Sequence, residues 1–391
     1  MSLARCYNID DLRKLARRKL PSPMFNYIDG GADDEWTLRR NTAAFDDYEL
    51  LPRYLNDIST LDLSTRVLGC ELALPFFLAP TGMSRLFHHH KEIGAAKAAG
   101  RAGTLYSLST LATTSLEDVA AATRGPKMFQ VYIFKDRELT RELVARCKQA
   151  GYQALCLTVD TPIAGNRERD HRYGMAMPPQ VFKLNTFLSY ATSFEWLLNF
   201  ALQPRFTLAN VAHRVDALSG GAMGVIEYIG TQFDRTVSWK DAEWLAREWG
   251  GPFVIKGMST PEDAKQAVSI GATAAMLSNH GGRQLDGVPA PIDTLAPIRD
   301  AIGDRLELIV DGGIRRGTHI LKALALGANA CSIGRPYLYG LAAGGEAGVD
   351  RAIALLREEV ARDLALLGCR SVSELRSDHV RALARSPRAP T

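Results

Sequence analysis

The sequence predicts an α/β fold in which eight parallel strands and eight helices alternate in a closed (β/α)8 (TIM) barrel. Three observations lead to this prediction. Eight short apolar runs follow one another, most of them continuous, as is typical of parallel strands that are buried on both faces. Helix start and stop signals lie between the runs. Eight such units in succession favour a closed barrel over the alternative, an open doubly wound sheet. The runs are Leu74–Pro80, Leu105–Ser109, Lys127–Ile133, Ala154–Asp160, Pro252–Gly257, Ala274–His280, Leu306–Gly312 and Ala330–Arg335.

The helix signals between the runs are specific. Ser115 and Thr260 are each followed three residues later by an aspartate, a pattern typical of helix N-termini. Gly271 and Gly327 stand where the helical patterns end, as glycine commonly does just after a helix.

Three segments are expected outside the regular barrel, within a single domain of 391 residues. The stretch between the fourth strand and the helix near Ser238 exceeds seventy residues, far more than a usual βα loop, so we expect it to be either functional or mobile. The expected parts are an N-terminal helical segment (1–73, with a helix at Ile9–Leu20) that covers one barrel mouth, the barrel (74–345) with a loop insertion (172–236), and a C-terminal helix, Val349–Leu367, with a tail (346–391).

Composition excludes several classes of protein. Forty-seven Lys+Arg against 43 Asp+Glu leave a formal charge of +4, too small and dispersed for a nucleic-acid-binding face. The six cysteines form no C-x-x-C pair, which disfavours a zinc site or a disulfide framework. The chain shows no signal-peptide pattern and no apolar window of about 18 residues. We expect a cytoplasmic protein, or one held at the cytoplasmic face of the inner membrane.

Most of the expected strands end in polar or ionisable side chains. In enzymes with a (β/α)8 barrel, this end of the strands carries the active site. His280 and Arg283 stand together in a glycine-rich turn after the sixth strand. An arginine fork binds a carboxylate through two parallel bonds, and an imidazole accepts a proton near neutral pH. Arg167 offers a second cation. Asp160 is placed to orient His280, although it could instead cap the next helix.

Two further patterns concern cofactors. Loops after the seventh and eighth strands, around Gly312 and Gly334, are suited to bind a phosphate through backbone N–H groups. No G-x-G-x-x-G follows a strand, so a nicotinamide cofactor is disfavoured. We expect no metal at His88-His89-His90, because three consecutive residues should not converge on one ion from regular structure.

Six motifs, which keep their order over about residues 5–375, resemble those of the FMN-dependent L-2-hydroxy acid oxidising enzymes. This family includes glycolate oxidase, L-lactate dehydrogenase and mandelate dehydrogenase. The motifs are Ser278–Asp286 (SNHGGRQLD), Ala79–Met83 (APTGM), Leu157–Pro162 (LTVDTP), Val254–Gly257 (VIKG), Asp311–Gly317 (DGGIRRG) and Ile333–Pro336 (IGRP).

The resemblance implies a role for each matching residue. His280 is the catalytic base, with Asp160 as its partner; Arg283 and Arg167 hold the substrate carboxylate, and Tyr27 and Tyr132 hydrogen-bond the substrate. An ammonium at Lys256, otherwise read as a surface cation, would stabilise reduced flavin. The residues expected to bind FMN are Ala79, Pro80, Thr81, Gly82, Ser109, Gln130, Thr158, Lys256, Ser278, Asp311, Gly312, Gly313, Arg315, Gly334 and Arg335.

The branch of the family is indicated by few residues. Gly82 stands where the oxidases usually have alanine, which favours a dehydrogenase that passes electrons to quinone or a cytochrome. Leu111 and Ala164 stand where glycolate oxidase has bulkier groups. We expect L-lactate as substrate and a homotetramer. The alternatives are a peroxide-forming oxidase, a mandelate-type dehydrogenase and, in other classes, an FMN-dependent isomerase or a non-catalytic flavin-binding barrel.

Within the insertion, Leu184–Gln203 carries Glu195 as its single charged residue and is rich in aromatic side chains. We expect one helix here. It would either lie in the interface of a membrane, close to membrane quinone, or be buried on the barrel or at a subunit contact.

Overall fold

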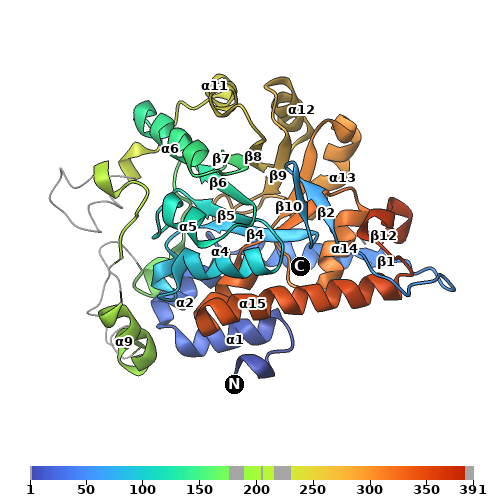
Figure 1. The fold of residues 1–391 in the computed structure, drawn as a ribbon, viewed down its shortest axis with the longest axis horizontal. Coiled ribbons are helices and arrows are strands. Elements are labelled where there is room, and N and C mark those ends of the chain that lie inside the picture. Colours follow the sequence, from blue (N-terminus) through green and yellow to red (C-terminus); the bar gives the residue numbers. More distant parts are fainter. Residues whose placement is uncertain (1, 176–188, 204–205, 215–229, 384–391) are drawn as a thin grey trace.

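A computed structural model describes residues 2–175, 189–203, 206–214 and 230–383 of the chain and shows a closed parallel barrel (Figure 1). The strands follow one another around the barrel in the order β10-β11-β4-β5-β6-β7-β8-β9. Each expected strand is confirmed, with ends that differ by at most two residues, and closure excludes the open sheet. The strands are β4 (Phe76–Thr81), β5 (Tyr106–Ser109), β6 (Lys127–Val131), β7 (Ala154–Thr158), β8 (Phe253–Met258), β9 (Ala274–Ser278), β10 (Glu307–Asp311) and β11 (Ala330–Ile333).

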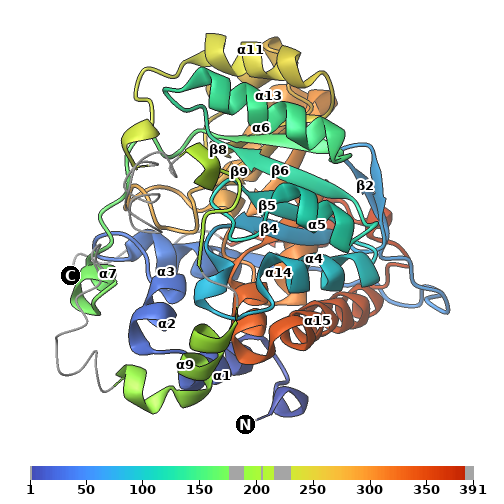
Figure 2. The same ribbon diagram turned by 60° about the vertical axis from the view of Figure 1, so that its left-hand side comes forward.

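A ring of helices covers the outside of the barrel (Figures 1 and 2). The Ser115 and Thr260 side chains each accept a hydrogen bond from the backbone N–H three residues on, which confirms both N-caps. The helices are α4 (Lys91–Arg101), α5 (Leu116–Ala122), α6 (Arg137–Gln149), α11 (Trp239–Trp249), α12 (Pro261–Ser269), α13 (Pro291–Ile302), α14 (Gly317–Ala325) and α15 (Arg335–Leu366).

The two ends of the barrel differ. At the N-terminal end of the strands, the hairpin of β2 (Thr65–Val67) and β3 (Cys70–Leu72) packs its buried Val67, Leu68 and Leu72 against barrel residues such as Phe77. This end is therefore closed by apolar packing, which leaves the C-terminal end of the strands for a site.

The N-terminal segment covers that other end, as expected. It forms α1 (Ile9–Lys19), α2 (Ser22–Asp29) and α3 (Trp36–Ala43). The Ala32 N–H donates to the Gly282 carbonyl (2.8 Å), and so ties the segment after α2 to the turn that follows β9.

The C-terminal helix predicted at Val349–Leu367 is confirmed within a few residues as the second part of α15. Helix α15 as a whole runs from Arg335, directly after β11, to Leu366, and it consists of two helical parts. It bends at Gly344 and Gly345, where φ is +60° at Gly345, and the helical pattern is interrupted there. The chain then ends with β12 (Val380–Ala382), which pairs with β1 (Tyr48–Leu50). Short 3-10 helices are formed by Leu3–Arg5, Ala44–Asp47, Ser84–Leu86, Ala212–Arg214, Gly303–Arg305, Val372–Glu374 and Ser377–His379.

The insertion lies between β7 and α11 and contains α7 (Glu168–Arg172) and α9 (Phe194–Leu202). The expectation of one continuous helix over 184–203 is wrong, because the helical residues 189–192 are separated from α9 by Ser193, whose φ and ψ of −97° and 51° are not helical. Residues 184–188 lie outside the described part of the chain. Helix α9 stands at the edge of the molecule (Figures 1 and 2). Among the described helices, none is both long enough and apolar enough to span a membrane.

Candidate active site

A cavity of ≈ 360 Å³ opens at the C-terminal end of the barrel strands and is lined by nearly all the predicted site residues. Asp160 and Ser278 are the exceptions. Each lies behind a residue that does line the cavity: Asp160 behind His280, and Ser278 behind Lys256. The structure thus brings the predicted residues together at one end of the barrel and separates those that face the cavity from the two that lie behind them.

His280 and Asp160 form a hydrogen-bonded pair. The distance from His280 Nδ1 to Asp160 Oδ1 is 2.9 Å, so the alternative role of Asp160 as a helix cap is not what the structure shows. Burial acts to raise the pKa of Asp160, but His280 and Lys256 oppose it, and the pKa lies below its ordinary value. An ionised Asp160 accepts the Nδ1 proton and leaves Nε2 of the neutral imidazole as the basic nitrogen.

The turn that carries His280 has an unusual backbone. His280, Gly281 and Gly282 all have positive φ, at 57°, 67° and 74°. For a non-glycine residue this conformation is uncommon, and strained residues of this kind cluster at active sites. A Cβ at Gly282 would lie 2.6 Å from the Leu38 nitrogen, so glycine is needed for the contact with α3.

Two arginines lie over one tyrosine at the cavity wall. The guanidinium carbons of Arg283 and Arg167 are 4.7 Å and 5.6 Å from the centre of the Tyr27 ring. Arg283 donates to the backbone carbonyls of Tyr27 and of Gly30 (3.2 Å). Burial lowers the pKa of Arg283, and the positive charge of the neighbouring Arg167 lowers it further. Helix α2 therefore positions the arginine as well as the tyrosine.

Sequence reasoning missed Asp170, which lies beside these cations. Its Oδ2 is 3.7 Å from Arg167, and its Oδ1 is buried without a hydrogen-bond partner in the described part of the chain. Burial raises the pKa of Asp170, although Arg283 and Arg167 act against it. The spacing Arg167-x-x-Asp170 on a short helix was the signal that could have revealed it.

Lys256 is buried at the bottom of the cavity together with two anionic or polar partners. Its Nζ lies 2.7 Å from Ser278 Oγ and 2.7 Å from Asp311 Oδ2. Burial alone would lower the pKa of Lys256, but Asp311 and Asp160 more than compensate and raise it. The ammonium is therefore charged at neutral pH, and the surface-cation alternative is excluded by its 4% exposure.

The cavity has unused hydrogen-bonding atoms that fit a flavin ring. Gln130 Nε2 and Thr158 Oγ1 are buried and have no partner within the described residues. Ser109 Oγ donates to Gln130 Oε1 (3.0 Å), which fixes the orientation of this amide. A donor, a hydroxyl and the Lys256 ammonium match the carbonyls and ring nitrogens of an isoalloxazine, since buried polar groups require partners.

The other end of the cavity suits a phosphate. Gly312 and Gly313 follow β10 with φ of 146° and 77°. Gly334 is the N-cap of α15 and provides no side-chain cap, so backbone N–H groups remain for an anion. Arg335 is more constrained than the sequence suggested. Its guanidinium donates to the carbonyls of Ile28 (2.8 Å), Gly281 (2.8 Å) and Gly30 (2.7 Å), and burial lowers its pKa to about 10. It therefore holds the N-terminal segment in place as well as facing the cavity.

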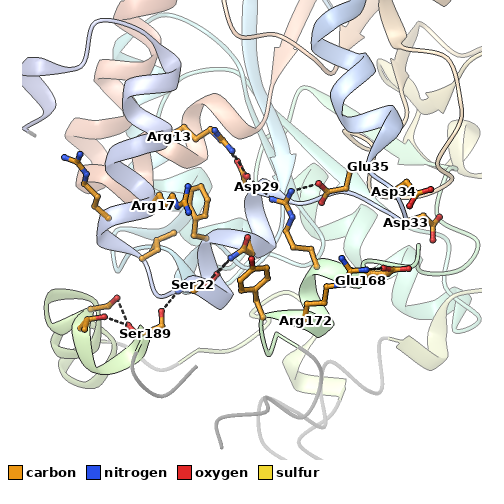
Figure 3. Close-up of a pocket in the computed structure, with 18 residues that line it drawn as sticks. Arg13, Arg17, Ser22, Asp29, Asp33, Asp34, Glu35, Glu168, Arg172 and Ser189 are labelled. Atoms are coloured by element: carbon orange, nitrogen blue, oxygen red, sulfur yellow. Dashed lines mark hydrogen bonds and ion pairs between the residues drawn. The ribbon is translucent and has the colours of Figure 1, made fainter. Parts of the chain in front are cut away.

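A second, larger cavity of ≈ 840 Å³ lies outside the barrel mouth, between α1, α2, α7 and residues 189–193, which precede α9 (Figure 3). It contains none of the predicted site residues. Its central carboxylate, Asp29, is bonded to Arg13 (2.5 and 2.9 Å), to Arg169 (3.0 Å) and to the Tyr339 hydroxyl (2.8 Å). This network braces α2 against its neighbours, so we place the chemistry in the smaller cavity.

The three consecutive histidines converge, contrary to the expectation from sequence. One ligand atom from each of His88, His89 and His90 lies within 4.8 Å of the others. The residues occupy a turn before α4 rather than regular structure, which allows the rings to converge. The Nδ1 atoms of His88 and His90 accept backbone N–H groups, from His90 and Glu346 (both 3.0 Å).

Comparisons with known proteins agree with the site. The family model described as FMN-dependent dehydrogenase matches residues 16–382. The chain is 40% identical to glycolate oxidase 1 of Zea mays over 373 residues, covering 95% of each chain, and 42% identical to a putative L-lactate dehydrogenase of Mycobacterium tuberculosis over 384 residues, 98% of this chain and 91% of that one. A crystal structure of the monotopic membrane protein (S)-mandelate dehydrogenase superposes with a TM-score of 0.92 at 34% identity, covering 97% of this chain and 100% of that one.

The matching family consists of oxidoreductases that act on CH–OH groups. This argues against the two alternatives from other classes, an FMN-dependent isomerase and a non-catalytic flavin-binding barrel. The fold, the cavity and the full-length matches lead to one conclusion: the chain belongs to the FMN-dependent 2-hydroxy acid dehydrogenase and oxidase family.

Proposed function

We propose that this protein oxidises an L-2-hydroxy acid, with L-lactate as the first candidate, to the 2-oxo acid and passes the electrons to quinone or a cytochrome. The observation that carries the proposal is the convergence on one cavity of a base, His280 with Asp160 behind it, and a carboxylate-binding pair, Arg283 and Arg167. The 42% identity to a putative L-lactate dehydrogenase supports the choice of substrate.

The two arginines bind and orient the substrate carboxylate. The Nη1 atom of Arg283 donates to the carbonyls of Tyr27 and Gly30, in and directly after α2, and these bonds fix the plane of the guanidinium. The remaining donors can form the paired, charge-assisted bonds that a carboxylate accepts. Tyr27 and Tyr132 lie on the cavity wall, where their hydroxyls can bond the substrate hydroxyl or carboxylate.

His280 accepts the proton that the substrate loses. Conversion of CH–OH to C=O releases two electrons and two protons. One proton goes to Nε2 of His280, and the two electrons with the other proton would go to the acceptor that FMN supplies. Asp160 stabilises the imidazolium that forms, since it remains ionised. His280 has this role whether the substrate carbon gives up a hydride or first a proton.

The residues that would hold FMN are those at the strand ends, with Gln130, Thr158 and Lys256 at the ring and the Gly312–Gly313 and Gly334 backbone at the phosphate. FMN supplies the two-electron acceptor for the oxidation. The charged Lys256 ammonium favours the more negative, reduced state of a neighbouring ring.

A mandelate-type substrate is the second candidate. Leu111 and Ala164 both line the cavity, and Ala164 is small. The insertion adds Leu208 and Phe233 to the same wall, which makes this part of the cavity apolar. An aryl group would pack there. Steady-state kcat/KM for L-lactate and L-mandelate, measured with an artificial acceptor, tests the order of the two substrates: the proposal predicts the higher value for L-lactate.

We further propose that α9 binds the surface of a membrane, where the quinone is found, and that the protein is a homotetramer. Phe194 and Leu202 are 70% and 73% exposed, and Leu198 is 47% exposed. Such an apolar helix face is suited to the interfacial region of a bilayer. The buried Arg85 fastens α9 to the barrel by donating to the carbonyls of Asn199 (3.0 Å) and Phe200 (3.2 Å).

A further inference from the structure

Tyr337, near the start of α15, makes a chain of hydrogen bonds with the end of β4. Its side chain is fully buried (0% exposed), and its hydroxyl is bonded to the Thr81 hydroxyl and to the Ala79 carbonyl (3.1 Å). Ala79 and Thr81 both line the cavity that fits FMN. Tyr337 itself does not line it, and sequence reasoning gave it no role.

The direction of each hydrogen bond follows from the groups present. A carbonyl can only accept, so the single Tyr337 hydroxyl proton goes to Ala79. The Tyr337 oxygen then accepts the Thr81 hydroxyl proton. Thr81 thus has no proton left to donate toward the cavity and presents only acceptor lone pairs to a group bound there.

The end of β4 needs such support. The pairing of β4 with β5 shifts between Leu78 and Thr81, and the residue between Ala79 and Thr81 is Pro80, which has no N–H. The regular ladder therefore does not fix this segment. The Tyr337 hydroxyl supplies the Ala79 carbonyl with a partner from α15, the helix whose first residues form the phosphate end of the cavity.

We propose that Tyr337 is a positioning residue of the FMN site, which fixes the end of β4 and holds the Thr81 hydroxyl as an acceptor toward the flavin. The proposal rests on the placement of FMN in this cavity. Because a flavin gains N–H groups on reduction, a fixed acceptor favours its reduced form. Loss of the Tyr337 hydroxyl should therefore weaken FMN binding and lower the midpoint potential of the bound flavin.

The test uses Tyr337→Phe, which keeps the ring in its site and removes one oxygen. We expect a roughly three- to tenfold rise in the FMN Kd, as for the loss of one or two hydrogen bonds, together with a changed visible spectrum and a lower midpoint potential. Tyr106→Phe is the matched control, because Tyr106 is also buried and its hydroxyl has no hydrogen-bond partner among the described residues. It should leave all three readouts as in the wild type.

If Tyr337→Phe does not fold, Thr81→Val tests the same hydrogen bond from its other partner. It should reproduce the changes in Kd, spectrum and potential, and the double variant should be no worse than the single ones, because both remove the same chain of bonds. A Tyr337→Phe protein that melts earlier but keeps the Kd, spectrum and potential of the Tyr106→Phe control would overturn the proposal. None of these measurements needs a substrate, so they stand apart from the proposed oxidation.

Discussion

The imidazole of His280 and the carboxylate of Asp160 meet 2.9 Å apart although they follow different strands, β9 and β7, and are separated by 120 residues of chain. Thr161 also approaches His280, with its Oγ1 at 3.5 Å from Nδ1. The pair sets the tautomer of the imidazole, and this directs the basic Nε2 toward the cavity that also holds Arg283.

Replacement of His280 by glutamine should retain FMN and lose nearly all turnover. The flavin contacts come from other strands, whereas the proton acceptor is removed, and loss of a general base costs about 10²–10⁴ in rate. The FMN-to-protein ratio and kcat with an artificial acceptor check both parts. A variant that retains its flavin and turns over at near the wild-type rate would remove His280 from its role.

Replacement of Arg283 by lysine should lower kcat/KM for the hydroxy acid by roughly ten- to a hundredfold, because an ammonium cannot reproduce the paired bonds of the guanidinium. Arg305→Lys, at an exposed position far from the cavity, is the control. If an uncharged substrate analogue is impaired equally, recognition of the carboxylate is not the reason for the defect.

Reduced enzyme should transfer electrons to a quinone analogue or dye much faster than to oxygen. A Cβ at Gly82 would lie 3.1 Å from both the Cβ and the carbonyl oxygen of Leu111, so the chain here is packed around a glycine. Stopped-flow reoxidation in air-saturated buffer measures the rate with oxygen directly. Fast reoxidation with one equivalent of peroxide would place the protein among the oxidases instead.

Aspartate at both Leu198 and Leu202 should weaken binding to liposomes and leave dye-linked turnover unchanged, because α9 is exposed and the chemistry lies on the barrel. Leu366→Asp is a matched control, as Leu366 is 67% exposed on a different helix. Flotation that is equal for the double variant, the control and the wild type would reject the membrane role. A failure of soluble expression confined to the double variant would instead favour a buried or subunit contact for α9.

Stability should decrease as the pH falls from 6.5 toward 5. Burial, followed by the neighbouring His89 and His90, lowers the pKa of His88 from 6.5 to about 3 in the folded protein. The unfolded chain therefore takes up a proton below pH 6.5 that the folded chain excludes, which reduces the free energy of unfolding by about 2 kcal/mol at pH 5.

Urea unfolding at pH 7 and pH 5 tests this effect. His88→Gln should lose less stability between the two values than the wild type does. His213→Gln serves as the control, since His213 lies at the surface with an exposed side chain (44%). An unchanged pH dependence in His88→Gln would mean that other groups account for the loss.

How far the sequence predicted the structure depends on the kind of residue. The strands and the polar groups at their ends were found because a buried parallel strand and a strand-end polar residue leave local patterns. Two contacts have no such local pattern: the hydrogen bonds from Arg335 to the end of α2, and the hydrogen bond from Tyr337 to Ala79. Each of them joins segments that are far apart in the sequence. The break at Ser193 was missed because apolar periodicity does not locate helix ends. Phe233 and Leu208 reach the cavity from the insertion, whose path depends on tertiary packing.

The most direct test of the central claim is an anaerobic titration of the purified yellow protein with the two enantiomers of lactate and of mandelate, followed by flavin absorbance. The account predicts that L-lactate bleaches the flavin to the reduced form, that L-mandelate does so if the apolar wall admits an aryl group, and that neither D-isomer does. Bound FMN that stays oxidised with every L-2-hydroxy acid, or that is bleached equally by the D-isomers, would contradict it.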